Sequence, residues 1–330
     1  MKKIIYKIVK ILFPFLLGGS ILYWMYREMD FSEISDALFH QMNWTWMLLS
    51  FIPGILAQVF RGLRWKQALE PLDEQPRTNN CINAIFLSYA VSLIIPRIGE
   101  VVRCGILNRT DGTSFPKALG TVVTERAIDT LIVFILVTTV FLWQLPLLSE
   151  FLGITGFNIS HIFANFSQTG IIITIVCIVC ILLMVFVLFR HISFMGKIHS
   201  TMSDLKSGIL SLKDVRNMPL YLFYSIGIWV AYFLHYYVTF FCFDFTENLG
   251  LTAALLSFCT GTTSVLVPTP NGAGPWHFAV KTALVICGLS ASNAIVYVLI
   301  VHTIQTLLLV VLGVYAAICL QFCKRHLATH

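Results

Sequence analysis

A short charged sequence interrupts an otherwise apolar stretch of this chain. Residues 96–103 read Pro-Arg-Ile-Gly-Glu-Val-Val-Arg and follow the apolar run 82–95. A charged side chain at the centre of a membrane costs at least ~2.5 kcal/mol, so such residues usually mark a pathway or a site. The proline and the glycine break a helix, and broken backbone is tolerated in a bilayer only where protein or water shields it. Residues 96–103 therefore predict a polar break inside a membrane protein.

The composition agrees with this interpretation. Of the 330 residues, 57% are hydrophobic and 12% are charged, whereas soluble domains average roughly a quarter charged residues. We therefore expect an integral membrane protein. The net charge of +6 reflects where Lys and Arg lie relative to the bilayer, and no nucleic-acid partner is expected. No small-residue cleavage site follows the apolar residues 11–26, which predicts a retained first span rather than a signal peptide.

Six apolar segments are long enough to cross about 30 Å of hydrocarbon as helices. They lie at about residues 11–26, 44–60, 119–143, 170–189, 219–243 and 294–322. Two further apolar regions, at about 80–108 and 252–289, are each divided by a centre that is rich in Pro or Gly. These two regions could be pairs of short spans, single spans, or re-entrant helical hairpins that enter and leave by one membrane face.

The distribution of positive charge favours the hairpins. If both broken regions are hairpins and the N-terminus is cytoplasmic, 17 of the 22 Lys and Arg residues lie on the cytoplasmic side. Treating residues 80–96 as a full span would instead place the five cations of residues 190–218 outside, against the positive-inside rule. We therefore predict an all-α protein with about six full spans, two re-entrant helical hairpins and both termini in the cytoplasm. Short paired spans remain the alternative.

The same map predicts an inverted repeat of three plus three spans. Residues 1–145 and 146–330 each read as span, amphipathic linker, span, hairpin, span. Phe31, Ile34, Leu38 and Met42 recur at helical spacing in the first linker, and apolar residues between 194 and 212 do so in the second. Three spans per half give the halves opposite topology, a recurrent design among transporters. The alternative is that two membrane halves look alike by chance.

The first broken region and the span that follows it contain charged site candidates. Glu100 and Arg103 are three residues apart, which predicts either an ion pair that merely lets the hairpin exist or a docking point for a lipid headgroup. In the second interpretation Arg97 or Arg103 faces a phosphate, which suits the planar guanidinium. The next span contains three further charged residues, Glu125, Arg126 and Asp129. They either reach the membrane surface or join Arg97, Glu100 and Arg103 in one network.

The second broken region contains polar candidates of another kind. Its turn, residues 268–275, has three prolines and includes Gly272 and Gly274, whose freed backbone groups could form a nest for an ion. His277 is either a proton-sensitive group or an ordinary hydrogen-bonded histidine. Lys281 lies in an apolar helix and is expected to need a partner.

A basic cluster follows the second span. Arg61, Arg64 and Lys66 are interpreted as cytoplasmic anchors, or alternatively as contacts to anionic lipid headgroups. The chain shows no nucleophile–base constellation, no phosphate-binding loop and no regular set of metal ligands. We therefore expect no catalytic residues, no metal and no cofactor, and we do not expect an ATP-driven pump.

These motifs together resemble the transmembrane region of lysylphosphatidylglycerol synthases, a flippase-like family. The resemblance rests on residues 61–65, 96–103, 124–129 and 268–274, whose order covers about residues 60–320. It implies a lipid-translocating domain, known as the part of multidomain synthases that flips aminoacylated phosphatidylglycerol. The chain ends at His330 without the soluble aminoacyltransferase domain, so synthase activity is not expected. Trp276 and His277 stand where relatives often have a glutamate, which puts a shared coupling mechanism in question.

The sequence thus predicts a bacterial inner-membrane protein that moves a polar-headed phospholipid or a lipid-linked intermediate between leaflets. One alternative is a membrane-embedded transferase that uses Glu100, Glu125 or His277 on a lipid phosphate. Another is an accessory membrane protein that transports nothing. Membrane lipids are the expected partners, and a homo-oligomer is compatible with the sequence.

Overall fold

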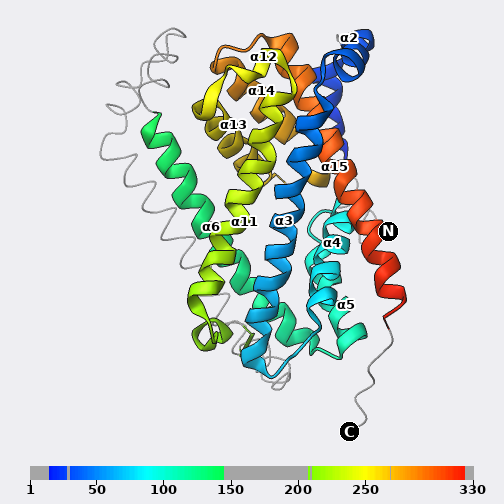
Figure 1. Ribbon diagram of the computed structural model, residues 1–330, viewed down its shortest axis with the longest axis vertical. Helices are drawn as coiled ribbons and strands as arrows, with labels where there is room; N and C mark the ends of the chain where they lie inside the picture. Colours follow the sequence, from blue (N-terminus) through cyan, green and yellow to red (C-terminus); the bar gives the residue numbers. More distant parts are fainter. Residues whose placement is uncertain (1–14, 28–29, 145–206, 209, 268, 324–330) are drawn as a thin grey trace, which may run out of the picture. The chain divides into compact units, whose positions relative to one another are not determined.

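The computed structural model describes residues 15–27, 30–144, 207–208, 210–267 and 269–323, and the statements below concern this part of the chain. These residues form helices and turns and contain no strand (Figure 1). Residues 1–137 and 204–330 belong to one compact unit, and residues 138–203 belong to a second. Of the second unit, residues 138–144 are described, and they form the end of one long helix. The first unit contains every site discussed below.

Four helical segments are long and apolar enough to cross a membrane. They are built on α3 (Trp44–Leu69), α6 (Phe115–Trp143), α11 (Met218–Tyr237) and α15 (Ala291–Gln321). They match the predicted spans 44–60, 119–143, 219–243 and 294–322, so the prediction of an all-helical integral membrane protein is confirmed. The predicted span 170–189 lies outside the described residues, as does most of the second linker. The first predicted span contains a shorter apolar helix, Phe15–Tyr26.

Side chains at the helix starts account for several boundaries. The Asn43 side chain accepts a hydrogen bond from the Thr45 amide at the start of α3, and the Ser290 hydroxyl accepts one from the Asn293 amide at the start of α15. Such caps satisfy amides that have no partner within the helix. The first predicted linker is helical, as α2 (Phe31–Asp36) followed by the π-helix η1 (Ala37–Gln41).

Each broken apolar region is a pair of short helices. The first contains α4 (Thr78–Ile94) and α5 (Gly99–Asp111). The second contains α13 (Gly250–Ser264) and α14 (Pro275–Ile286), with the 3-10 turn η5 (Pro270–Gly272) between them. The two members of each pair pack against each other. The breaks thus lie where the prolines and glycines predict them, while re-entrant insertion and the inverted repeat stay predictions.

A glycine permits the close packing of the first pair. A methyl group added at Gly99 would clash with the backbone oxygen of Ser88, so α5 can begin this close to α4 only with hydrogen in place of a side chain. In the turn between α4 and α5, Arg97 adopts a φ of 65°. This left-handed conformation is uncommon for residues other than glycine. The local sequence therefore holds a sharp reversal between two helices.

The long helices share the core and expose apolar side chains. α3 runs beside α11, and α15 packs on α4 (Figure 1). The start and the end of α3 contribute Met47 and Trp65 to two separate apolar clusters. Between these apolar residues, the buried side of α3 is polar and includes Ser50, Gln58 and Arg61. Outward apolar side chains, which suit contact with lipid, include Phe134 on α6, Phe223 and Ile226 on α11, and Val311 and Val314 on α15.

Candidate functional site

A network of buried ion pairs joins α3, α5 and α6. Arg61 and Arg64 of α3 donate to the two carboxylate oxygens of Asp129, over 2.9 and 2.7 Å. Arg103 of α5 donates to Glu125 Oε2 over 2.7 Å, and Arg64 Nε lies 3.6 Å from Glu125 Oε1. The helical period explains the grouping, because Arg61 with Arg64, and Glu125 with Asp129, each share one helix face. The three helices are thereby joined by charge.

The network is buried and carries a net positive charge. Arg61, Arg64, Arg103 and Glu125 are each at most 2% exposed, and Asp129 is 4% exposed. Three guanidinium groups therefore share two carboxylates. The partly exposed pair of Arg126 and Glu100, 2.6 Å apart, adds one charge of each sign and leaves the net charge positive. An uncompensated charge in a low-dielectric interior is expensive.

Aromatic rings supply part of the compensation. The guanidinium carbon of Arg103 lies 4.5 Å from the centre of the Trp65 ring. That of Arg61 lies 5.8 Å from the ring centres of both Tyr89 and Tyr232. Such cation–π contacts are worth about 2 kcal/mol when desolvated. They attract the positive groups through the negative faces of the rings.

Several donors of the network have no acceptor among the described residues. Buried nitrogens without a hydrogen bond include Arg61 Nε, Arg64 Nη2 and both Nε and Nη1 of Arg103, and one buried acceptor of the network, Glu125 Oε1, also lacks a partner. Buried polar groups are nearly always hydrogen-bonded, so each exception calls for an explanation. The oxygens of an anion, such as a phosphate, would satisfy these donors and neutralise the excess charge.

The structure changes one predicted pairing. Glu100 and Arg103 do not pair with each other; Glu100 binds Arg126 and Arg103 binds Glu125, because α5 turns these two side chains to different parts of α6. Arg126 and Asp129, three residues apart on α6, also lie within 3.6 Å of each other. Glu100, Arg103, Glu125, Arg126 and Asp129 thus meet in one network.

The basic cluster at the end of α3 is mostly interior. The sequence placed Arg61 and Arg64 at the cytoplasmic surface, but both are buried because the carboxylates of α6 neutralise them. A buried guanidinium does not contact a lipid headgroup at the surface. Lys66 is partly buried, and its Nζ donates to Thr78 Oγ1 over 3.0 Å.

Arg97 lies apart from the network. Its side chain is exposed, and Nη2 donates to the backbone oxygen of Leu266 over 3.2 Å. Leu266 belongs to the segment between α13 and η5, so this bond brings the breaks of the two helix pairs together. The two breaks are 169 residues apart in the chain.

The turn of the second pair uses its own amides. The Gly272 amide donates to Thr269 O over 3.2 Å, and the Gly274 amide contacts His277 Nδ1 at 3.4 Å. The predicted nest therefore does not present free donors at these two glycines. A methyl group at Gly274, where φ is 91°, would lie 2.8 Å from the backbone oxygen of Gly18 in the first apolar helix. Gly274 thus serves the close packing of two chain segments.

The remaining predicted residues of this region lie on α14. His277 is buried, and its ring centre lies 4.4 Å from that of His302. Lys281 is partly buried, and the described residues provide it with no hydrogen bond or ion pair. The partner expected for this lysine is therefore not found in the part of the chain that the structure describes.

A cavity of about 210 Å³, whose wall is mostly apolar with a few polar side chains, lies beside the network. Tyr89 and Tyr232, the two rings that flank Arg61, form part of its wall. No Asp, Glu, Lys or Arg is among its lining residues, which are Gly54, Gln58, Tyr89, Tyr232, His235, Val265, Asn271, Trp276, His302, Gln305, Thr306, Leu308, Leu309 and Leu312.

Sequence reasoning missed this cavity. The available signal was the helical spacing of isolated polar residues within apolar spans, namely Gly54 and Gln58 on α3, and His302, Gln305 and Thr306 on α15. Each residue alone reads as an ordinary core residue, and the cavity exists only because α3, α11 and α15 bring them together.

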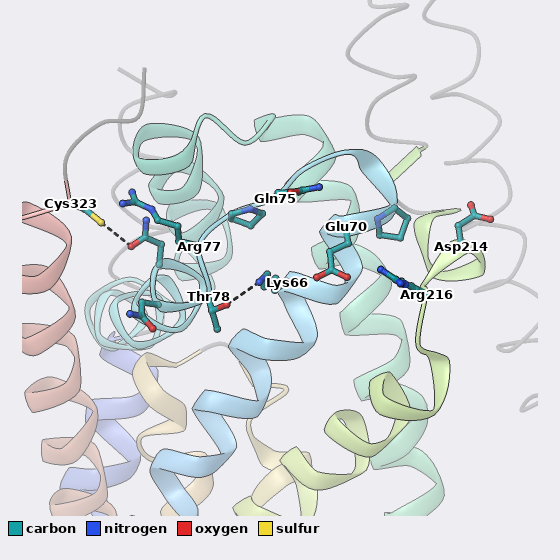
Figure 2. Close-up of a pocket in the computed structure, with 12 residues that line it drawn as sticks. Lys66, Glu70, Gln75, Arg77, Thr78, Asp214, Arg216 and Cys323 are labelled. Carbon is teal, nitrogen blue, oxygen red and sulfur yellow. Dashed lines mark hydrogen bonds between the residues drawn. The ribbon is translucent and has the colours of Figure 1, made fainter. Parts of the chain in front are cut away.

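A larger hollow of about 900 Å³ lies at the end of α3. Figure 2 shows Lys66, Glu70 and Arg216 facing it. At its rim, burial raises the pKa of the Asp111 carboxyl, but hydrogen bonds from Asn80, Arg77 and Thr110 outweigh this effect and hold that pKa below its usual range. Cations and carboxylates both line this hollow, so its charge is mixed.

The chain was compared with known proteins. The family model described as the lysylphosphatidylglycerol synthase TM region matches residues 11–313. The comparisons with curated proteins and with solved structures give no match.

Proposed function

Because the chain belongs to the lysylphosphatidylglycerol synthase TM region family, we propose that it moves a polar-headed phospholipid or a lipid-linked intermediate between the leaflets of a membrane. The family and the four apolar helices make it an integral membrane protein related to lipid metabolism or transport. The proposal adds the transport step and a place for the phosphate.

The observation that carries the proposal is the net positive, buried network with unpaired donors. Arg61, Arg64 and Arg103 point more N–H groups into the interior than Glu125 and Asp129 accept. A lipid phosphate supplies acceptor oxygens and negative charge, and the planar fork of arginine suits it.

The two helix breaks suggest the route. The Arg97–Leu266 bond joins them, and the cavity is lined by residues next to the second break, including Val265 and Asn271. A headgroup that crosses between polar side chains, while its acyl chains stay in lipid, avoids the cost of bare transfer through hydrocarbon. Because the network is buried, the proposal requires a rearrangement that opens it to one side at a time.

The predicted topology is part of this proposal. It comprises six spans, two re-entrant hairpins in an inverted repeat, a bacterial inner membrane and cytoplasmic termini. Its support is the excess of Lys and Arg in the segments assigned to the cytoplasm. Membrane lipids are the proposed partners.

The experiment is lipid transfer in vesicles. The purified full chain is reconstituted into liposomes with a short-chain fluorescent phospholipid, and albumin extracts the label from the outer leaflet. We expect the chain to let albumin reach the inner-leaflet pool, unlike protein-free vesicles. An unchanged inner pool would refute transport. Mass spectrometry of the recovered lipids tests the transferase alternative, because a transferase would change their mass.

A further inference from the structure

We propose that the 210 Å³ cavity binds an uncharged polyhydroxylated group, the size of one sugar or cyclitol ring, through hydroxyl donors of the ligand. This inference rests on the proposed function in one respect, since the group is expected to be the headgroup of the lipid. Its support comes from the cavity alone, in four steps.

The first step is an unsatisfied acceptor in the cavity wall. Gln58 is 2% exposed and lines the cavity, yet its Oε1 has no hydrogen-bond partner. A buried amide oxygen without a partner destabilises the folded protein. Gln58 lies in the apolar span α3, where an aliphatic residue would avoid that cost. A ligand that donates a hydrogen bond would remove it.

The second step is the hydrogen bonding of the neighbouring polar groups. His235 Nδ1 donates to Ser50 O over 2.6 Å, and His302 Nε2 donates to Asn271 O over 3.2 Å, since a carbonyl oxygen can only accept. The other nitrogen of the neutral His235 ring is then an acceptor, while His302 Nδ1 already has the Thr306 hydroxyl as its partner, at 3.5 Å. Gln305 Nε2 donates to His235 O over 3.1 Å, so its Oε1 is left as an acceptor too. The wall therefore presents Gln58 Oε1, Gln305 Oε1 and one nitrogen of His235 as acceptors to the hydroxyl donors of a ligand.

The charge near the cavity favours hydroxyl groups over ammonium groups as the donors of the ligand. Both are donors, but the ion network beside the cavity has a net positive charge. Tyr89 and Tyr232 stand between the cavity and Arg61, whose guanidinium carbon is 5.8 Å from both ring centres. A cation in the cavity would be repelled, and no carboxylate in the wall would compensate it. Hydroxyl groups donate without this penalty.

The fourth step is size and shape. A volume of about 210 Å³ corresponds to roughly seven water molecules, and pockets for drug-sized ligands have about 300–1,000 Å³. The cavity thus holds a headgroup but no acyl chain. Trp276 and the two tyrosines supply flat ring faces against which the C–H face of a sugar-like ring packs.

The test compares lipids that differ only beyond the phosphate. The full chain in nanodiscs is titrated with short-chain phosphatidylinositol, phosphatidic acid and phosphatidylethanolamine, and with free inositol, and binding is measured by native mass spectrometry. We expect phosphatidylinositol to bind about tenfold more tightly than the other two lipids. Binding of free inositol at similar affinity would identify a soluble polyol as the ligand of the same cavity. Equal affinity for the three lipids, with no binding of free inositol, would overturn the inference.

A pair of variants locates the binding. Gln58→Leu removes the acceptor from the cavity and is expected to weaken inositol-lipid binding about tenfold. Gln67→Leu is the matched control, because Gln67 is on the same helix, also has an unpartnered Oε1 and lies outside the cavity wall. Equal affinities of Gln58→Leu and wild type would overturn the inference. Selective binding without transfer between leaflets would refute the proposed function and leave this inference standing.

Discussion

Arg103 donates a 2.7 Å hydrogen bond to Glu125, and both side chains are at most 1% exposed. The two residues are on different helices and are 22 positions apart, whereas Glu100 is one turn from Arg103 and binds Arg126 instead. The charges of residues 96–103 thus join α5 to α6 rather than neutralising each other within α5.

Removing one member of the buried pair should be costly. We expect Arg103→Met to lower the free energy of unfolding by about 3 kcal/mol or more, because Glu125 is left buried with less compensation. In a double-mutant cycle, Arg103→Met and Glu125→Gln should show a coupling energy of about 2–3 kcal/mol. The measurement is equilibrium unfolding in mixed micelles.

The cycle between Arg103→Met and Glu100→Gln is the control, and its coupling energy should be under about 0.5 kcal/mol. A larger coupling with Glu100 than with Glu125 would contradict the pairing seen here and would restore the pair predicted from spacing.

The sequence could predict the helices but not these partners. An apolar run of about twenty residues has few alternatives to a spanning helix, and α3, α6, α11 and α15 lie where expected. The face of α5 that meets α6 depends on how the two helices pack, and the spacing of charged residues in the sequence does not predict this packing. For the same reason the sequence predicts Arg61 and Arg64 as surface anchors, because their partner Asp129 lies far from them in the chain.

Gly274→Ala should destabilise the protein more than Gly288→Ala. Both glycines have left-handed φ, of 91° and 97°, so both variants strain the backbone. Only at Gly274 would the new methyl group also meet a backbone oxygen, that of Gly18, at 2.8 Å, while Gly288 has open space. We expect Gly274→Ala to cost about 1–3 kcal/mol more. Equal melting temperatures of the two variants would show that the first apolar helix does not pack on this turn.

The stability contributed by Asp111 should depend on pH. Its pKa is lower in the folded protein than in the unfolded chain, so its contribution is present above about pH 4 and is lost as the pH falls through the folded-state value. Asp111→Asn should therefore be less stable than wild type at pH 6, and the difference should narrow towards pH 3. A difference that stays constant or grows on acidification would contradict the hydrogen bonds from Asn80 and Arg77.

The contact between the two helix breaks can be tested by cross-linking. In a cysteine-free background, cysteines at Arg97 and Leu266 should react with a short bifunctional reagent, because the Arg97 side chain reaches Leu266 O. Cysteines at Arg97 and Arg77 are the control, since the 17 residues of α4 separate them, a helix length of about 25 Å. Reaction of the control pair alone would contradict the contact.

The cavity shows another limit of sequence reasoning. Gln58, His235 and His302 lie on three different spans, α3, α11 and α15. Gly272 and Gly274 are predicted as site residues because the turn between α13 and α14 is rich in Pro and Gly, but their amides make contacts within the chain. A site assembled from distant single residues is recognised only once their helices are packed.

Lipid transfer with the two breaks reversibly joined tests the central claim most directly. The cysteine pair at Arg97 and Leu266 is linked by a reagent with a reducible disulfide in reconstituted vesicles, and the inner-leaflet pool that reaches albumin is measured before linking, after linking and after reduction. If headgroups pass between the breaks, transfer stops on linking and returns on reduction. Equal transfer in the linked and the reduced state would contradict the route, and no transfer in either state would contradict the proposed function itself.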